Sequence, residues 1–243
     1  VAAVAMRALP RASLVPVRIT FSDSSPPPLL DEAAARRFAA MVTTAARYMR
    51  MRGVRLCNIS WGFTSEAVEH SLAQNGVEPD PEARARRAQR IFDLMLEGMT
   101  EAIASSPDIL FVIAAGNAGQ DVDFVRDLPG SINLPNVLTV AAADAQGRAA
   151  SFASTGASVD LYARGTDVES IVPGGGRLRW SGASLAAPQV VNAAAKLLLI
   201  DSGLSSRELA RLLVESASPA PGSDLPLLNP RAARAQLRAR RGH

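Results

Sequence analysis

Residues 109–114 read Ile-Leu-Phe-Val-Ile-Ala, a continuous apolar run. Such a run is typical of a parallel β-strand that is covered on both faces. Shorter runs at 55–60 and 137–142 predict two more strands. Segments with helical periodicity separate these runs, so strands and helices alternate along the chain. The alternation favours an α/β fold with three layers, in which a mainly parallel sheet carries helices on both faces.

Helical spacing of apolar residues predicts helices at 31–52, 82–104, 184–200, 205–216 and 229–240. The helix at 184–200 is apolar on nearly every side, so we expect it to be buried. Ser205 and Glu208 form a capping box for the next helix. Further strands are predicted at 13–20, 158–162 and 177–180, with a loop at 22–30. No internal repeat or domain boundary is visible.

Composition excludes several classes of protein. The chain has 243 residues and one cysteine, Cys57, so it can form no intramolecular disulfide and has no Cys/His cluster for zinc. No apolar run is long enough to span a membrane. The net charge of +3 comes from arginines within 229–243, which predict a basic C-terminal helix or tail. We therefore expect neither a nucleic acid nor a membrane as partner.

Two polar residues stand where ligands bind in parallel sheets, beyond the carboxyl ends of the strands. Ser184 begins the buried helix, where the positive helix end favours a nearby negative charge. Asn117 follows the strand at 109–114, and its side-chain N–H could donate to an oxyanion. Taken singly, each has a plainer interpretation: Ser184 as a helix N-cap and Asn117 as a turn residue.

Several ordered motifs together resemble the subtilisin-like serine proteases. The stretch Ser-Gly-Ala-Ser-Leu-Ala-Ala-Pro at 181–188 is similar to that family's nucleophile motif, with Ala183 and Leu185 where Thr and Met are usual. Val-Ile-Ala-Ala-Gly-Asn at 112–117 resembles the oxyanion-hole strand. Asn-Ile-Ser-Trp-Gly at 58–62 resembles the substrate-binding strand, with Trp61 replacing the commoner Leu. The resemblance runs from about Ala12 to Leu237.

The resemblance implies a function and a set of site residues. It implies a serine endopeptidase that works through an acyl-enzyme, with Ser184 as the nucleophile. Asn117, together with the Ser184 backbone N–H, would hold the oxyanion. Extended substrate and its primary side chain would bind at Ser60, Trp61 and Gly62 and at Ala114, Ala115 and Gly116.

The sequence departs from the family in lacking a base and its orienting carboxylate. Both precede the substrate strand in the family, but His70 follows it and His243 is the last residue. The early acids Asp23, Asp31 and Glu32 lie in a loop or at a helix start. Residues 1–5 resemble the continuation of the helix that holds the catalytic His.

We therefore expect 1–243 to be one subtilisin-like peptidase domain whose N-terminal part is missing. The Asp and His would come from an upstream segment or from a second chain. The alternative is a catalytically dead pseudoprotease that binds peptides or proteins. The opening residues 1–10 do not read as a secretory signal, and a signal upstream of Val1 stays open, so the compartment is not fixed.

Further expectations concern specificity, ligands and partners. By resemblance, Asp127 falls near the floor of the specificity pocket and would favour Arg or Lys before the cut; a surface acid is the plainer interpretation. No dense carboxylate loop is present, Asp121 and Asp123 being two ligands at most, so no metal and no cofactor are predicted.

Helix 82–104 is a candidate surface for a protein partner, or else a solvated helix. A nucleotide-binding domain fails, because Gly174-Gly175-Gly176 opens no helix.

Overall fold

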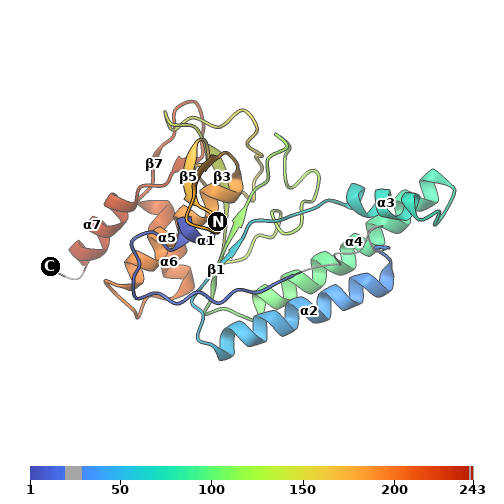
Figure 1. Cartoon of the computed structure of the whole chain (residues 1–243), viewed down its shortest axis with the longest axis horizontal. Helices are drawn as coiled ribbons and strands as arrows, with labels where there is room; N and C mark the ends of the chain where they lie inside the picture. Colours follow the sequence, from blue (N-terminus) through green and yellow to red (C-terminus); the bar gives the residue numbers. More distant parts are fainter. Residues whose placement is uncertain (20–28, 241, 243) are drawn as a thin grey trace.

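The computed structural model describes residues 1–19, 29–240 and 242. Its main sheet has the strand order β1-β2-β3-β4-β8-β7, and β1 to β4 run parallel (Figure 1). The strands are β1 (Leu56–Ile59), β2 (Leu110–Ala114), β3 (Val137–Ala143), β4 (Leu161–Arg164), β7 (Ser218–Pro219) and β8 (Pro226–Leu227). The mainly parallel sheet expected from the apolar runs is confirmed.

Helices cover both faces of the sheet, as predicted. On one side lie α1 (Ala2–Ala5), α5 (Ala183–Leu198), α6 (Ser206–Glu215) and α7 (Pro230–Arg240); on the other lie α2 (Glu32–Met51), α3 (Ser65–Gln74) and α4 (Pro81–Ala104) (Figure 1). Successive residues of β2 point into different layers, because side chains alternate along a strand. Leu110 and Val112 pack on the α5 side, whereas Phe111 and Ile113 pack on the α2 and α4 side.

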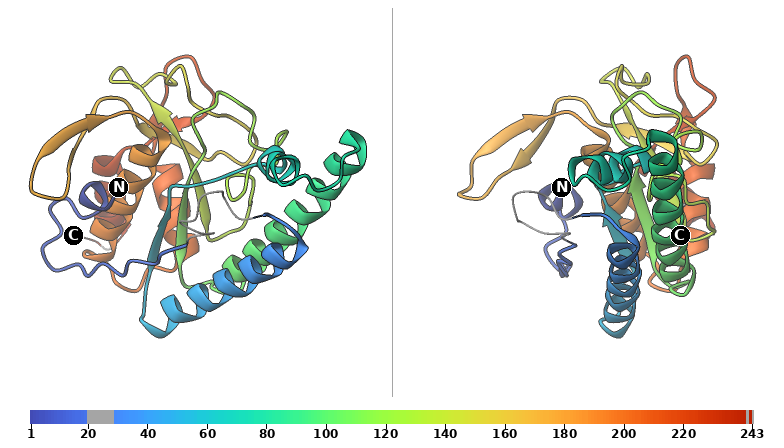
Figure 2. Two further views of the ribbon diagram at one scale, coloured as in Figure 1. Left: turned by 45° about the vertical axis from the view of Figure 1, so that its right-hand side comes forward. Right: turned by 90° about the vertical axis from the view of Figure 1, so that its right-hand side faces the viewer.

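Helices α2 and α4 lie side by side and run in the same direction: Glu32 pairs with Arg87 near their starts, and Arg50 bonds to Ser105 at their ends. This α2–α4 pair extends beyond the sheet (Figures 1 and 2). The two helices approach closely at Gly98 of α4, where a Cβ would lie 2.4 Å from the Cβ of Ala39. Asp31 caps α2 by accepting from the Ala34 N–H at 2.7 Å. The capping box predicted for α6 is confirmed at Ser205 and Glu208.

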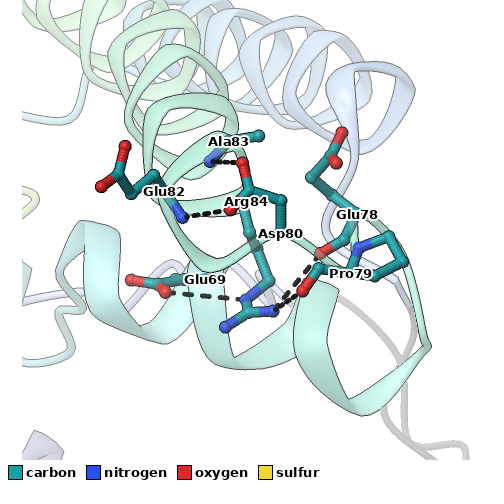
Figure 3. A network of polar contacts seen from close by, with 7 residues as sticks. All are labelled: Glu69, Glu78, Pro79, Asp80, Glu82, Ala83 and Arg84. Atoms are coloured by element: carbon teal, nitrogen blue, oxygen red, sulfur yellow. Dashed lines mark hydrogen bonds and ion pairs between the residues drawn. The ribbon is translucent and has the colours of Figure 1, made fainter.

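At the end of the α2–α4 pair where both helices begin, Arg84 joins α3 to the start of α4 (Figure 3). Its Nε lies 3.6 Å from Oε1 of Glu69, and its Nη1 donates to the carbonyls of Glu78 at 3.3 Å and Pro79 at 3.5 Å. Asp80 caps α4 by accepting from the N–H of Ala83 at 3.1 Å. This network anchors α3, a helix that the sequence analysis did not predict.

The strand predicted at 13–20 is wrong over its described part. Residues 13–19 form no strand, and Leu14 and Val17 are exposed. The segment has strand-forming residues but makes no ladder with β1, and a strand is not stable without a paired neighbour. Thr20 and most of the loop predicted at 22–30 lie outside the described residues.

One other strand prediction needs correction in its bounds, and one is confirmed. The strand predicted at 158–162 is β4, Leu161–Arg164, because Asp123 accepts hydrogen bonds from the backbone and hydroxyl of Ser158 and holds that residue in a loop. The strand at 177–180 exists as β6 (Arg177–Trp180) but lies outside the main sheet. It pairs antiparallel with β5 (Val168–Ile171) in a hairpin that projects from the body (Figure 2, right).

Candidate active site

Ser184 and Ser60 meet where the carboxyl end of β1 faces the first turn of α5. The Ser184 hydroxyl donates to the Ser60 carbonyl at 3.4 Å, and the Ser60 hydroxyl donates to the Ser184 carbonyl at 3.4 Å. Asn58 holds Ser60 from the strand side, with Nδ2 donating to Oγ at 2.9 Å. Both contacts of Ser184 are long, and its side chain is half-buried rather than sealed in the core. The hydroxyl is therefore lightly held at the edge of the sheet.

Asn117 reaches the same point from the end of β2. Its Oδ1 accepts a hydrogen bond from the Ala183 N–H at 2.7 Å. Gly182 precedes this contact with a φ of +154°, a backbone conformation that favours glycine. Asn117 is exposed, and within the described residues its Nδ2 has no hydrogen bond. An amide donor thus lies beside the start of the helix that carries Ser184.

The segments expected to bind substrate flank this point, but they are not equally accessible. Ala114 and Ala115 are buried, and the Ala115 N–H donates to the Val140 carbonyl at 2.9 Å as a continuation of the sheet. Gly116 is half-buried, with a φ of +96°. Trp61 is half-buried and Gly62 is exposed. Exposed surface at this position is therefore contributed by Gly116, Trp61 and Gly62 rather than by the two alanines.

Asp127 lies against Gly62. A Cβ on Gly62 would come within 2.9 Å of Oδ1 of Asp127, and a Cβ on Gly130 within 2.7 Å of the same oxygen. The carboxylate accepts one backbone hydrogen bond, from Gly130 at 3.1 Å. Burial raises the pKa of Asp127 to about 6. Asp127 is thus a partly buried acid beside a predicted substrate-binding glycine, held between two residues that have no side chain.

The histidines and early acids do not reach this site in the described part of the chain. His70 is exposed on α3, which lies at the end of the α2–α4 pair that is remote from α5 (Figures 1 and 2). Asp31 caps a helix, and Glu32 is paired with Arg87 at 2.9 Å. Asp23 and His243 lie outside the described residues. Among those described, Ser184 has no hydrogen bond to an imidazole or a carboxylate.

An unpaired sheet edge adjoins the two serines, and sequence reasoning did not foresee it. In the described sheet β1 pairs with β2 alone, so its other edge is open. An apolar cavity of about 620 Å³ runs along this edge, with residues 54–59 on one side and 12–17 on another. Oδ1 of Asn58, which is among the lining residues, is buried without a hydrogen-bond partner in the described structure. A buried acceptor without a donor is costly, so this edge is chemically incomplete.

Two features of the described residues bear on other ligands and on membranes. No three His, Cys, Asp or Glu side chains in that part of the chain gather in a group that could hold a metal ion. None of its helices has the length and apolar character needed to cross a membrane.

Asp160, which sequence reasoning did not single out, also has a pKa raised to about 6 by burial. Its carboxylate accepts a hydrogen bond from the Thr139 N–H at 2.7 Å, between β3 and β4.

The sequence and fold of this chain are matched in known proteins. The chain belongs to the subtilase family, whose sequence profile matches residues 5–240. It is 36% identical over 152 residues to the subtilisin-like serine protease Pen ch 13 of Penicillium rubens, a match covering 58% of this chain and 37% of that protein. It is 35% identical over 164 residues to a subtilisin-like protease of Coccidioides posadasii, covering 65% of this chain and 36% of the relative.

Solved structures agree with this assignment. The self-cleaved protease domain of PatA is 26% identical, with a TM-score of 0.61 over 83% of this chain and 68% of that one. A lanthipeptide protease has a TM-score of 0.65 at 18% identity, over 82% of this chain and 66% of that one, which shows a shared fold. The matched region spans little more than a third of the length of the curated relatives.

Proposed function

We propose that the chain is the nucleophile-bearing part of a serine endopeptidase. Ser184 attacks the carbonyl of a peptide bond, and an acyl-enzyme forms and is then hydrolysed. Asn117 Nδ2 and the Ser184 backbone N–H stabilise the oxyanion of the tetrahedral intermediate. The observation that carries the proposal is the hydrogen bond that the Ala183 N–H donates to Asn117 Oδ1 at 2.7 Å, because it holds the Asn117 amide beside the helix turn that carries Ser184.

The base and its orienting carboxylate come from outside the described residues. Ser184 needs a general base, since a serine hydroxyl is a weak nucleophile near neutral pH. The open edge of β1 supports an external source. A strand added parallel to β1 would end at the same border of the sheet as Ser60, because the carboxyl ends of parallel strands lie together. It would pair the free strand edge, fill the apolar cavity and offer a donor to Asn58 Oδ1.

Asp127 gives the proposed enzyme a preference for Arg or Lys before the cleaved bond. Its carboxylate lies beside Gly62, with one backbone donor and no cationic partner in the described structure. A guanidinium entering from substrate would supply the missing charge and bind with two parallel hydrogen bonds. Neither Gly62 nor Gly130 places a side chain against the carboxylate.

Labelling with a serine-directed fluorophosphonate tests the proposal. The protein is purified as its source organism makes it, with any segment or chain that accompanies these 243 residues. We expect stoichiometric labelling at Ser184 and none in Ser184→Ala. Ser181→Ala is the matched control, because Ser181 lies three residues away and its hydroxyl accepts from the Asp167 N–H at 3.0 Å. Labelling that survives in Ser184→Ala contradicts the assignment.

The second candidate is a peptide-binding pseudoprotease, favoured by the lack of a base at Ser184 among the described residues. It predicts that the natural protein binds Arg-containing peptides and remains unlabelled by the fluorophosphonate. The two candidates thus differ in one measurement on one sample. In both, residues 1–243 act as one peptidase-type domain, and the solvent face of α4 is a surface available to a protein partner.

A further inference from the structure

Arg126, the residue before Asp127, is fixed to α4 rather than to the sheet. Its Nη1 lies 2.7 Å from Oδ1 of Asp93 on α4. Its guanidinium also lies over the ring of Phe92, with Cζ 5.8 Å from the ring centroid, a distance at which a cation is attracted to an aromatic face. The loop that carries the pocket acid is therefore attached to α4 by one side chain.

The backbone at Arg126 is strained. Its φ is +51°, in the left-handed region that residues with a Cβ rarely adopt. Such a conformation persists only where neighbouring contacts over-determine it, and it is found preferentially at functional sites. On the other side of Asp127, Leu128 exchanges two backbone hydrogen bonds with Phe63, each 3.0 Å long. Asp127 is thus held between α4 and the segment that follows Trp61 and Gly62.

A row of aromatic rings connects the same parts of the molecule. Phe38 of α2 meets Trp61 edge to face at 6.2 Å, Trp61 stacks on Phe63 at 6.4 Å, and Phe63 meets Phe92 of α4 edge to face at 6.1 Å. Arg126 lies at the end of this row. The α2–α4 pair therefore contacts the expected substrate-binding segment and the loop that carries Asp127 through one continuous set of side chains.

We propose that Asp93 and Arg126 are positioning residues that set where the Asp127 carboxylate lies, so that the α2–α4 pair determines the selectivity of the pocket for a cationic side chain. The inference rests on the proposed function. The pair's side chains are 44% and 47% exposed, and ion pairs this exposed contribute little to folding stability. Bidentate recognition of a guanidinium demands tight geometry, so a small shift of the loop is expected to affect selectivity far more than stability.

The test measures binding of two tetrapeptides that differ only in Arg or Leu at the position before the cleaved bond. Calorimetry is done on the naturally assembled protein carrying Ser184→Ala, which prevents turnover. The variants are Asp93→Asn, which removes the charge, and Arg126→Gly, which removes the side chain and relieves the backbone strain. We expect each to lower the Arg-over-Leu affinity ratio about five- to tenfold, with Leu-peptide affinity unchanged. Arg126→Gly is expected to keep its melting temperature.

Two controls separate positioning from general damage. Asp93→Glu keeps the carboxylate and is expected to retain the ratio. Arg86→Gln breaks a comparable pair on the same helix, with Glu82 at 3.4 Å, and is expected to leave the ratio unchanged. A ratio that stays within twofold of the parent in both Asp93→Asn and Arg126→Gly overturns the inference while leaving the proposed function intact. If the parent itself shows no preference for Arg, the specificity assignment fails and the inference fails with it.

Discussion

The side chain of Asn117 accepts a hydrogen bond from the backbone N–H of Ala183, with 2.7 Å between Oδ1 and N. This bond joins the end of β2 to the first turn of α5, elements 66 residues apart in the sequence. Because Oδ1 is occupied, the orientation of the amide is fixed and its NH2 group faces away from Ala183. The first turn of α5 therefore orients the Asn117 amide as well as carrying Ser184, the proposed nucleophile.

Asn117→Asp separates the structural role of this residue from its proposed chemical role. Aspartate keeps the acceptor for Ala183 but loses the donor and adds a negative charge beside the oxyanion. We expect kcat for peptide hydrolysis by the natural protein to fall at least ~10²-fold, the lower end of a range measured for such a donor in subtilisin, itself a subtilase. Activity assays with a chromogenic peptide and thermal melts measure the two roles. A loss under tenfold, with the fold intact, contradicts the oxyanion role.

The raised pKa of Asp127 predicts a pH dependence of binding. Burial places that pKa at about 6, so the carboxyl is mostly neutral at pH 5 and ionised at pH 7. Affinity for a peptide with Arg before the cleaved bond is expected to rise through this window and then level off, while Leu-peptide affinity stays flat. Calorimetric titrations from pH 5 to 8 measure both. Asp127→Asn is expected to flatten the Arg profile, and a profile that keeps its rise would exclude Asp127 as the titrating group.

The same shift predicts how stability varies with pH. The folded-state pKa lies above the unfolded value of 3.8, so between about pH 4 and 6 the folded protein binds more protons than the unfolded chain. Stability from this group is therefore lost as pH rises through that window, and Asp160 contributes with the same sign. Asp127→Asn is expected to stabilise the protein by ~2 kcal/mol at pH 8 and by almost nothing at pH 4. Urea unfolding at the two pH values measures the difference; an equal effect at both pH values argues against a buried ionised carboxylate.

The sequence predicted those parts of the fold that depend on local pattern. The run at 109–114 and the apolar helix at 184–200 need only their own residues to be recognised, and both are present as β2 and α5. Residues 13–19 have the same kind of residues but no paired neighbour, and strand formation depends on that neighbour. Ser184 and Asn117 were named from motifs, and the structure bonds Asn117 to Ala183, the residue before Ser184.

What could not be predicted arises from contacts between distant segments. Arg126 and Asp93 are unremarkable in the sequence, as an arginine in a loop and an acid on a helix. Their pairing depends on where α4 lies and on how the loop before Asp127 turns at the positive φ of Arg126. Asn58 is likewise ordinary until the sheet shows that its Oδ1 is buried at an open edge. No periodicity or spacing encodes such relationships.

The close crossing of α2 and α4 predicts a strong effect at Gly98. An added Cβ would lie 2.4 Å from the Ala39 Cβ and 2.9 Å from its Cα, so the helices must separate. Overpacking of this kind costs ~1–3 kcal/mol, against ~1 kcal/mol gained from the better helix propensity of alanine. We expect Gly98→Val, which gains little propensity and adds more volume, to destabilise the protein by ~2 kcal/mol or more in urea unfolding.

A double variant checks that the cost arises from this contact. Ala39→Gly removes the Cβ that Gly98 faces and is expected to recover part of the stability lost in Gly98→Ala, a coupling that independent sites do not show. Ala85→Val, at an exposed position of α4, is the control for a β-branched residue in the same helix. If Gly98→Val and Ala85→Val cost the same, the crossing is looser than the structure indicates.

Asn58 offers a test of the open edge in which the sign of the effect changes with context. In residues 1–243 alone, Asn58→Leu removes a buried acceptor that lacks a donor, a gain of ~1–3 kcal/mol, and loses the bond from Nδ2 to Ser60, a cost of ~1 kcal/mol. The net effect is expected to be neutral or stabilising. Where an external strand pairs with β1 and donates to Oδ1, the same substitution breaks two hydrogen bonds and is expected to destabilise by ~2 kcal/mol.

Unfolding of the 243-residue chain and of the product of the whole reading frame measures both cases. Leu56→Val, which changes an apolar residue of the same strand, is expected to have the same sign in both forms. Equal effects of Asn58→Leu in the two forms would show that nothing donates to this oxygen, and the proposed source of the catalytic base would lose its structural support.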